Sequence, residues 1–173
     1  MSKSKLIIAV LFTFIFVSVG ASVSSAATER DVEIAAVTLA REMASSNGYN
    51  LMTVDELKKA MDEGKDMLLV DTMRYEQSYK INHIPGAKHF TMSSKPMPTW
   101  DTSATEGKTQ EDFIKLLGPD KNRMIVIYCG FVMCPRSHTG IDWAKKLGYT
   151  NLYRVPGGVN AWRDSGYPLA KVE

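Results

Sequence analysis

The strongest constraint on the fold is a short apolar run, residues 124–128, that stops abruptly at Cys129. The run is too short for a helix, does not alternate with polar residues and contains β-branched side chains, which predicts a central strand covered on both faces. Beyond Ser137 apolar residues recur at helical spacing, and Gly148 is placed to end that helix. The segment therefore predicts a strand, a compact loop and a helix packed on a sheet.

This geometry suits an activated thiol at Cys129. Backbone N–H groups of the loop, the positive end of the helix dipole and the guanidinium of Arg136 would converge near the strand end. A cysteine near a helix N-terminus and a cation commonly has a pKa at or below neutrality, against about 8.5 for a free thiol. We therefore expect Cys129 to be mostly ionised at pH 7, in a cradle that accepts an oxyanion or a persulfide. The alternative is a small buried cysteine without chemistry.

Three motifs, taken in order, resemble the single-domain rhodaneses, a family of persulfide-forming sulfurtransferases. They are His83-Ile84-Pro85-Gly86-Ala87, the loop at residues 129–137, and Gly157-Gly158-Val159-Asn160-Ala161-Trp162 followed by Gly166-Tyr167-Pro168. The resemblance covers about residues 50–169. Family members typically carry the active-site arginine five residues after the cysteine, and the related cell-cycle phosphatases six, whereas Arg136 lies seven residues after Cys129. The loop of this chain is therefore longer than the family's.

The loop geometry and the resemblance together assign Cys129 and Arg136 as catalytic residues, with no cofactor. The expected substrate-binding residues are Gly130, Phe131, Val132, Met133, Cys134, Pro135, Ser137 and Arg74. Arg74 follows a second predicted strand, residues 67–70, and either binds an anionic substrate or is a solvated surface charge.

Asp71 and His83 are expected to support the site. Asp71 follows the strand at residues 67–70, and family members carry an acidic residue here that braces the active-site region. We interpret Asp71 as such a brace rather than a proton carrier, because an ionised cysteine needs no general base. His83 is expected to hydrogen-bond backbone in a Pro-Gly turn.

The expected function is sulfur transfer through a Cys129 persulfide. The donor would be a small anion such as thiosulfate or polysulfide, and the acceptor a thiol or another thiophilic molecule. One alternative is a cysteine-dependent phosphatase or arsenate-reductase-like enzyme that uses the enlarged loop. Another is a sulfur carrier or thiol redox switch without catalysis, because Cys134 lies five residues from Cys129.

Cys134 has no counterpart in the ordinary family loop. A reversible disulfide with Cys129 would protect the thiolate while stopping transfer, provided that the two Cα atoms approach within about 7 Å. A permanent structural bridge is disfavoured, because it would consume the nucleophile and close only a small ring. The other interpretation is that Cys134 only fills space under the loop.

Strands alternating with helices from residue 50 onward predict an α/β domain with a mainly parallel sheet covered by helices on both faces. Its remaining elements are helices at 54–63, 111–117 and 159–165, a helical turn at 75–80, and strands at 88–90 and 152–155. Thr53 and Glu56 are spaced as a capping box that begins the first of these helices. Residues 92–110 lack periodicity and form a long loop, in which Met97 and Trp100 either make an apolar lid over the active site or belong to a surface excursion.

Two segments precede this domain. Residues 1–26 have Lys3 and Lys5, an apolar stretch and small residues before a cleavage site, as in a bacterial secretory signal peptide, so a periplasmic or secreted protein is expected. An uncleaved anchor is the alternative. Residues 27–49 form a helical extension, with a helix at 31–43 that ends at Asn47-Gly48 and shows one apolar face, made of Val32, Ala35, Ala36, Leu39 and Met43. This helix packs on the domain or supports a homodimer.

Charge excludes some partners. Lys3 and Lys5 lie in the signal segment, so the rest of the chain has 19 basic and 19 acidic residues. A balanced charge favours neither nucleic acid nor an anionic membrane surface as a partner. The three histidines, His83, His89 and His138, are spread singly, so no metal site is expected.

Overall fold

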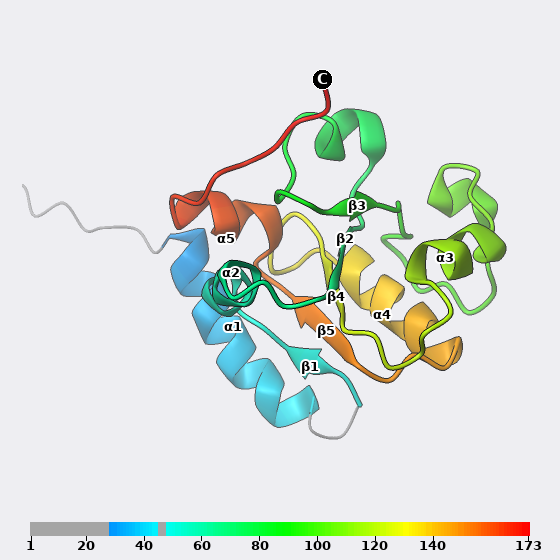
Figure 1. The fold of residues 1–173 in the computed structure, drawn as a ribbon, viewed down its shortest axis with the longest axis horizontal. Helices are drawn as coiled ribbons and strands as arrows, with labels where there is room; N and C mark the ends of the chain where they lie inside the picture. The colour runs from blue at the N-terminus through cyan, green and yellow to red at the C-terminus, as the bar shows by residue number, and fades with distance from the viewer. Residues whose placement is uncertain (1–27, 45–47) are drawn as a thin grey trace, which may run out of the picture.

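The computed structural model describes residues 28–44 and 48–173, which contain a parallel sheet of five strands. The strands are β1 (Asn50–Leu51), β2 (Leu68–Asp71), β3 (Lys88–His89), β4 (Ile125–Tyr128) and β5 (Leu152–Val155). Their order across the sheet is β1-β5-β4-β2-β3, and all neighbours pair in parallel (Figure 1). The predicted parallel sheet is confirmed, and Cys129 follows its central strand.

Helices cover both faces of the sheet, as predicted. Figure 1 shows α3 (Gln110–Leu117) and α4 (Arg136–Lys146) on one side, and α2 (Val54–Asp62) and α5 (Gly158–Asp164) on the other. Two further turns, the π-helix η1 (Tyr75–Tyr79) and the 3₁₀-helix η2 (Thr102–Thr105), lie in the connections. The extra N-terminal helix is α1 (Glu29–Ala44), which packs against α5 and β1.

The side-chain alternation of the strands builds two separate cores. In β4, Ile125 and Ile127 pack with α3 and α4, whereas Val126 and Tyr128 pack with α2 and α5. All four side chains are fully buried. Successive residues of a strand point to opposite faces, so a run without polar residues is what a doubly covered strand requires.

Helix α2 begins as its sequence predicts. The Thr53 hydroxyl accepts the Glu56 N–H, and the Glu56 carboxylate accepts the Thr53 N–H, which completes a capping box. A second capping box, made by Thr109 and Asp112, begins α3 and was not predicted.

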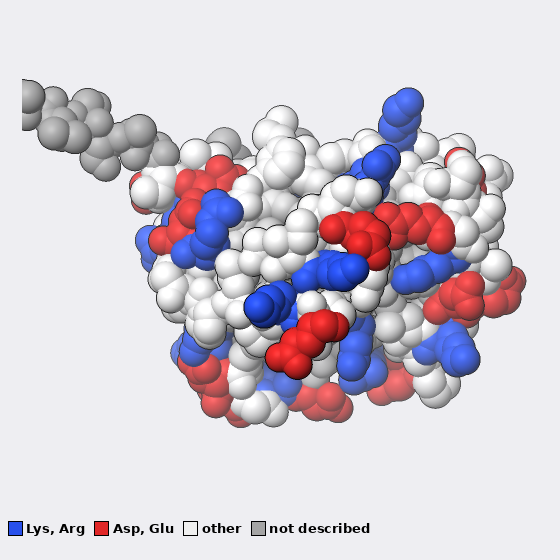
Figure 2. Space-filling model, turned by 90° about the horizontal axis from the view of Figure 1, so that it is seen from above, with Lys and Arg blue, Asp and Glu red and all other residues white. Residues whose placement is uncertain are grey.

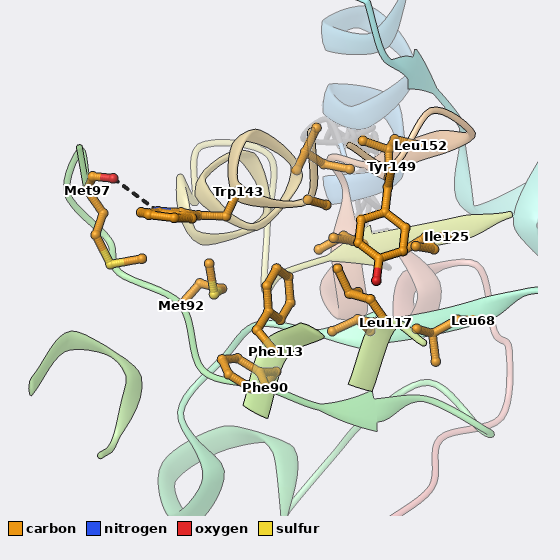
Figure 3. Packing of buried hydrophobic residues seen from close by; sticks show 14 residues of the cluster. Leu68, Phe90, Met92, Met97, Phe113, Leu117, Ile125, Trp143, Tyr149 and Leu152 are labelled. Atoms are coloured by element: carbon orange, nitrogen blue, oxygen red, sulfur yellow. Dashed lines mark hydrogen bonds between the residues drawn. The ribbon is translucent and has the colours of Figure 1, made fainter. Parts of the chain in front are cut away.

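Residues 92–109 do not form the apolar lid considered above. Met97 is only 7% exposed, and the Trp100 ring packs on the rings of Phe113 and Trp143 at 5.8 and 5.0 Å. Trp143 Nε1 also donates a hydrogen bond to the Met97 carbonyl (3.0 Å; Figure 3). The lid interpretation is wrong because α3 and α4 present an apolar surface on which these side chains are removed from water.

The predicted apolar face of the N-terminal helix is also wrong in part. Val32 is 43% exposed, whereas Glu33 and Val37 are buried against the domain. The pattern misled because the buried face includes a carboxylate, Glu33, whose Oε1 accepts the Val54 N–H (3.3 Å). The side chains of Leu39 and Met43, and Asn47 at the predicted helix end, lie outside the described residues. So does the predicted signal segment, residues 1–26. In the described part of the chain, no helix combines the length and apolarity needed to cross a membrane.

Candidate functional site

A cavity of about 420 Å³ opens beside Cys129 at the carboxyl edge of the sheet. Its wall includes residues that follow three different strands: Arg74 after β2, Cys129 after β4, and Asn160 after β5. The carboxyl ends of parallel strands share one edge, which is where open α/β sheets bind ligands. The topology therefore assembles this site from segments that are far apart in the sequence.

The charged side chains on the cavity wall are all arginines, one of which, Arg163, is paired with Asp164 (3.2 Å). Arg74, Arg136 and Arg163 line it, and within the described part of the chain no acidic side chain does. Burial, and next the nearby charge of Arg74, lower the pKa of Arg136. The Arg136 guanidinium also donates a hydrogen bond to the Met92 carbonyl, which fixes its position. Such a cavity favours an anionic ligand, because an anion would relieve the repulsion between the guanidinium groups.

Cys129 is bonded to Cys134 in a disulfide, with the two Cα atoms 6.2 Å apart. The expectation of an ionised free thiol therefore does not describe this form of the protein. The two residues come together because the intervening loop folds inward, with the Cys134 N–H donating to the Phe131 carbonyl (3.0 Å). The site as observed is the oxidised form of a cysteine pair.

Two of the loop amides already donate hydrogen bonds in this form. The Cys134 N–H is used by Phe131, and the Val132 N–H donates to the Glu29 carboxylate of α1 (3.4 Å). These two N–H groups are therefore not free to bind an anion while they keep these partners. Helix α1 thus reaches the loop that contains the cysteine pair through Glu29.

The start of α5 holds the end of β4 in place. The Val159 N–H donates to the Cys129 carbonyl (3.0 Å), and the Asn160 N–H donates to the Gly130 carbonyl (2.9 Å). Gly158 has a φ of +57°, and a Cβ at this position would lie 1.9 Å from the Cys129 carbonyl oxygen. Only glycine permits this approach without displacing the chain. The Gly157-Gly158 motif therefore positions the cysteine backbone.

Arg154 is a supporting residue that sequence reasoning missed. Its side chain leaves β5 toward α4, where Nε donates to the Ser137 hydroxyl (2.9 Å) and a terminal nitrogen donates to the Cys134 carbonyl (3.3 Å). The sequence did offer one signal, because Arg154 is the one charged residue in the strand predicted at residues 152–155. Gln77, Asn160 and Arg163 line the cavity and were also missed, because their positions depend on how distant segments pack.

The structure brings some predicted site residues to the cavity wall and places others elsewhere. Those on the wall are Cys129, Gly130, Phe131, Cys134, Arg136 and Arg74. The predicted residues outside the wall are Val132, Met133, Pro135, Ser137, Asp71 and His83. Met133 is 82% exposed, and Ser137 is buried under the loop, where it accepts the hydrogen bond from Arg154.

Asp71 and His83 lie beside the site and contact backbone. Burial raises the pKa of Asp71 to about 6, although its carboxylate accepts the Met73 N–H (2.8 Å). A ring nitrogen of His83 lies 2.8 Å from the Tyr79 carbonyl, and its ring stacks on that of Tyr79. The Asp71 contact fixes the segment that carries Met73 and Arg74 toward the cavity, and the His83 contacts hold the end of η1.

The outer surface lacks the concentration of one charge sign that the cavity has, at least on the face seen in Figure 2. On the face seen in Figure 2, acidic and basic side chains are interspersed rather than separated into areas of one sign. Local cations would therefore decide where an anion binds. In the part of the chain that the structure describes, no group of three or more His, Cys, Asp or Glu side chains is arranged to hold a metal ion.

Comparison with protein families gives one match, in which the model of the rhodanese-like domain matches residues 53–165. No curated protein matches the chain significantly.

Solved structures with the same fold include a protein of Bacillus halodurans, with 18% identity, a TM-score of 0.52, and coverage of 78% of this chain and 85% of that one. A thiosulfate sulfurtransferase from Pseudomonas aeruginosa has 16% identity and a TM-score of 0.51, over 83% of this chain and 24% of that one. A homodimeric polysulfide-sulfur transferase from Wolinella succinogenes has 16% identity and a TM-score of 0.50, over 80% and 90%. At these identities the structures share the fold.

Proposed function

Because the chain belongs to the rhodanese-like family, we propose that it is a sulfurtransferase in which Cys129 carries sulfur as a persulfide. The observation that carries this proposal is a cysteine at the end of the central strand, in a cavity lined by three arginines and, within the described residues, no acidic side chain. A negatively charged donor and a negatively charged persulfide are both stabilised in such a cavity. The names of two similar structures, a thiosulfate sulfurtransferase and a polysulfide-sulfur transferase, agree with this chemistry.

The reaction begins with reduction of the Cys129–Cys134 disulfide. A dithiol supplies two electrons and is itself oxidised to a disulfide, which leaves both cysteines as free thiols. Cys129 then loses its proton to solvent. Arg136 and the N-terminus of α4, which begins at that residue, favour the thiolate.

The Cys129 thiolate attacks the outer sulfur of a donor such as thiosulfate. A new S–S bond forms to Cys129, the donor's own S–S bond breaks, and sulfite leaves with the bonding electron pair. An acceptor such as cyanide then attacks the outer sulfur of the persulfide, and Cys129 leaves as the thiolate. Once Cys129 has ionised, neither transfer step needs a proton donor or acceptor from the protein, which fits the position of Asp71 outside the cavity wall.

Two matched variants test the proposal. Cys129→Ser and Cys134→Ser each remove the disulfide, but only Cys129→Ser also removes the proposed nucleophile. A difference in activity between the two variants therefore reports the nucleophile and not the loss of the disulfide. With thiosulfate as donor and cyanide as acceptor, Cys134→Ser should form thiocyanate and Cys129→Ser should not. Thiocyanate formation by Cys129→Ser would refute the assignment. Release of phosphate from a small aryl phosphate by the reduced wild type, without sulfur transfer, would instead favour the phosphatase class.

A thiol redox switch is the second candidate, and the closed disulfide is the observation that favours it. In that case Cys129 and Cys134 cycle between thiol and disulfide without passing sulfur to an acceptor. Redox cycling of the pair in the absence of sulfur transfer from thiosulfate or polysulfide would select this alternative.

Export is part of the proposal and is supported by the sequence of residues 1–26. An exported protein would work in an oxidising compartment, where a cysteine pair closes readily. Terminal sequencing of the protein recovered from outside the cytoplasm should give a mature chain that begins near Ala27. Recovery of the uncleaved chain in the cytoplasm would contradict export.

A further inference from the structure

A second cavity, of about 300 Å³, adjoins the one at Cys129. The two cavities share three wall residues, Arg74, Gln77 and Arg136, so these side chains stand between them. We call them the cysteine chamber and the outer chamber. A ligand that contacts the shared side chains can extend into both.

The two chambers differ in chemical character. The cysteine chamber has apolar wall residues, including Ile81, Phe131 and Leu169. The outer chamber is lined by hydroxyl and charged side chains, among them Ser93, Ser94 and Lys95, and Ala104 is its single apolar wall residue among those described. Thiosulfate is a small dianion without a hydrocarbon part, so its binding gains nothing from apolar wall residues. An organic thiol has a hydrocarbon part that would contact that wall when its sulfur is at Cys129.

The outer chamber has a net positive charge. Its wall has the cations Arg74, Lys95 and Arg136 and one carboxylate, Glu106. Glu106 is already occupied: its carboxylate accepts the Thr91 hydroxyl (2.7 Å) and lies 3.3 Å from the Tyr75 nitrogen, which donates to it. Among the residues that the structure describes, none of the three cations has a carboxylate within ion-pair distance. The chamber is therefore suited to an anionic group.

The segment that builds the outer chamber is held firmly. Met92 and Met97 are buried on either side of Ser93 and Lys95, and the Ser93 hydroxyl accepts the Lys95 N–H (3.0 Å). Farther along, the Thr105 hydroxyl donates to the Lys108 carbonyl (2.6 Å). A backbone fixed in this way loses little conformational entropy when a ligand binds.

We propose that the two chambers together bind an organic thiol or persulfide that carries a second anionic group, a carboxylate or a phosphate, distant from its sulfur. The sulfur would lie at Cys129, the hydrocarbon part against Ile81 and Phe131, and the anionic group between Lys95, Arg74 and the serine hydroxyls. This inference rests on the proposed function in one respect, that the ligand carries a thiol or persulfide sulfur that lies at Cys129. It makes Lys95 a residue that determines specificity among donors or acceptors.

Binding of unreactive ligands tests the inference without relying on catalysis. The reduced protein is titrated calorimetrically with S-methylglutathione, with its diethyl ester, in which both carboxylates are blocked, and with S-methylphosphopantetheine. We expect the ester to bind at least about tenfold more weakly than the acid, because it lacks the charge that the outer chamber recognises. The relative affinity of the carboxylate and phosphate ligands identifies the preferred anion.

Lys95→Gln should weaken the binding of the preferred anion about two- to fivefold, as expected for loss of one exposed ionic contact. Lys88→Gln is the matched control, because Lys88 is exposed in β3 and lines neither chamber. Equal affinity for S-methylglutathione and its ester, or equal affinity of Lys95→Gln and Lys88→Gln for the anions, would overturn the inference. Sulfur transfer from thiosulfate, measured separately, distinguishes the two proposals. If sulfur is transferred but the ligands do not bind as expected, only the role of the outer chamber in binding an anion is refuted. If the ligands bind as expected but sulfur is not transferred, that role is supported and the sulfurtransferase assignment is refuted.

Discussion

Replacement of Gly158 by alanine tests how the backbone of Cys129 is positioned. Gly158 has a φ of +57°, and a Cβ there would lie 1.9 Å from the Cys129 carbonyl oxygen and 2.7 Å from its carbonyl carbon. Both contacts are with backbone, which cannot rotate away as a long side chain can. The alanine methyl group therefore has to push α5 and the end of β4 apart.

The expected cost has two parts. A left-handed backbone conformation costs a non-glycine residue about 1–2 kcal/mol, and forcing an extra methyl group into a packed site costs about 1–3 kcal/mol. Together they predict a loss of about 2–5 kcal/mol in the free energy of unfolding. For a domain of this size, that corresponds to a fall of roughly 5–15 °C in Tm.

Gly148→Ala is the matched control for the backbone part. Gly148 also has a positive φ, +86°, but no heavy atom lies within 4 Å of its added Cβ. We therefore expect Gly148→Ala to lose only about 1–2 kcal/mol. Both variants are compared with the wild type by chemical denaturation followed by circular dichroism, with the disulfide intact throughout. Equal losses for the two variants would refute the close approach of Gly158 to the Cys129 carbonyl.

Three other predictions concern charge and oxidation. In the reduced protein, Arg136→Ala should raise the pKa of Cys129 and weaken thiosulfate binding, because it removes a cation beside the thiolate; the rate of alkylation against pH measures the first effect, and an unchanged profile would contradict it. Burial raises the pKa of Glu33 from 4.5 to about 7, with smaller effects from Val54, Asp55, Arg30 and Glu56, so the folded state binds the extra proton and stability should fall as the pH rises from about 4.5 to about 7. Glu33→Gln should remove this fall and gain, relative to the wild type, on the order of 3 kcal/mol between pH 5 and pH 8; parallel stability curves for the two proteins would contradict it. Mild peroxide should inactivate the wild type reversibly through the disulfide and Cys134→Ser irreversibly through sulfinic acid, and recovery of both proteins with dithiothreitol would leave Cys134 without a protective role.

Local sequence signals predicted the parts of the fold that are decided locally. The apolar run before Cys129 forms β4 with its predicted end, and Thr53 with Glu56 begins α2 as a capping box. Each of these depends on side-chain periodicity or on hydrogen bonds between residues three apart. The resemblance to rhodaneses covers the same elements, which the match to residues 53–165 confirms at the level of the family.

The errors arose where distant segments meet. Met97 and Trp100 were considered as a lid, but both contact Trp143 of α4. The indole N–H of Trp143 donates to the Met97 carbonyl, and its ring packs on that of Trp100. Glu33 is buried because Gly157 leaves room for it, since a Cβ there would lie 2.2 Å from Glu33 Cγ. Neither residue type nor spacing encodes such contacts.

The site shows the same division. Cys129 and Arg136 were recognised from their place between a strand and a helix. Arg154 was not recognised, because its contact with Ser137 spans the gap between β5 and α4. The spacing of Cys129 and Cys134 did not decide whether they form a disulfide. They can bond because the loop between them makes a tight turn that brings their Cα atoms to 6.2 Å.

The central claim is that Cys129 accepts sulfur, and one mass measurement tests it directly. The reduced protein is incubated with thiosulfate, digested without reductant, and analysed by mass spectrometry beside Cys129→Ser and Cys134→Ser. The peptide that contains Cys129 should gain about 32 Da, the mass of one sulfur atom, in the wild type and in Cys134→Ser, and a thiophilic acceptor should remove this mass. An unchanged Cys129 peptide in the wild type, or the same gain in Cys129→Ser, would contradict the account.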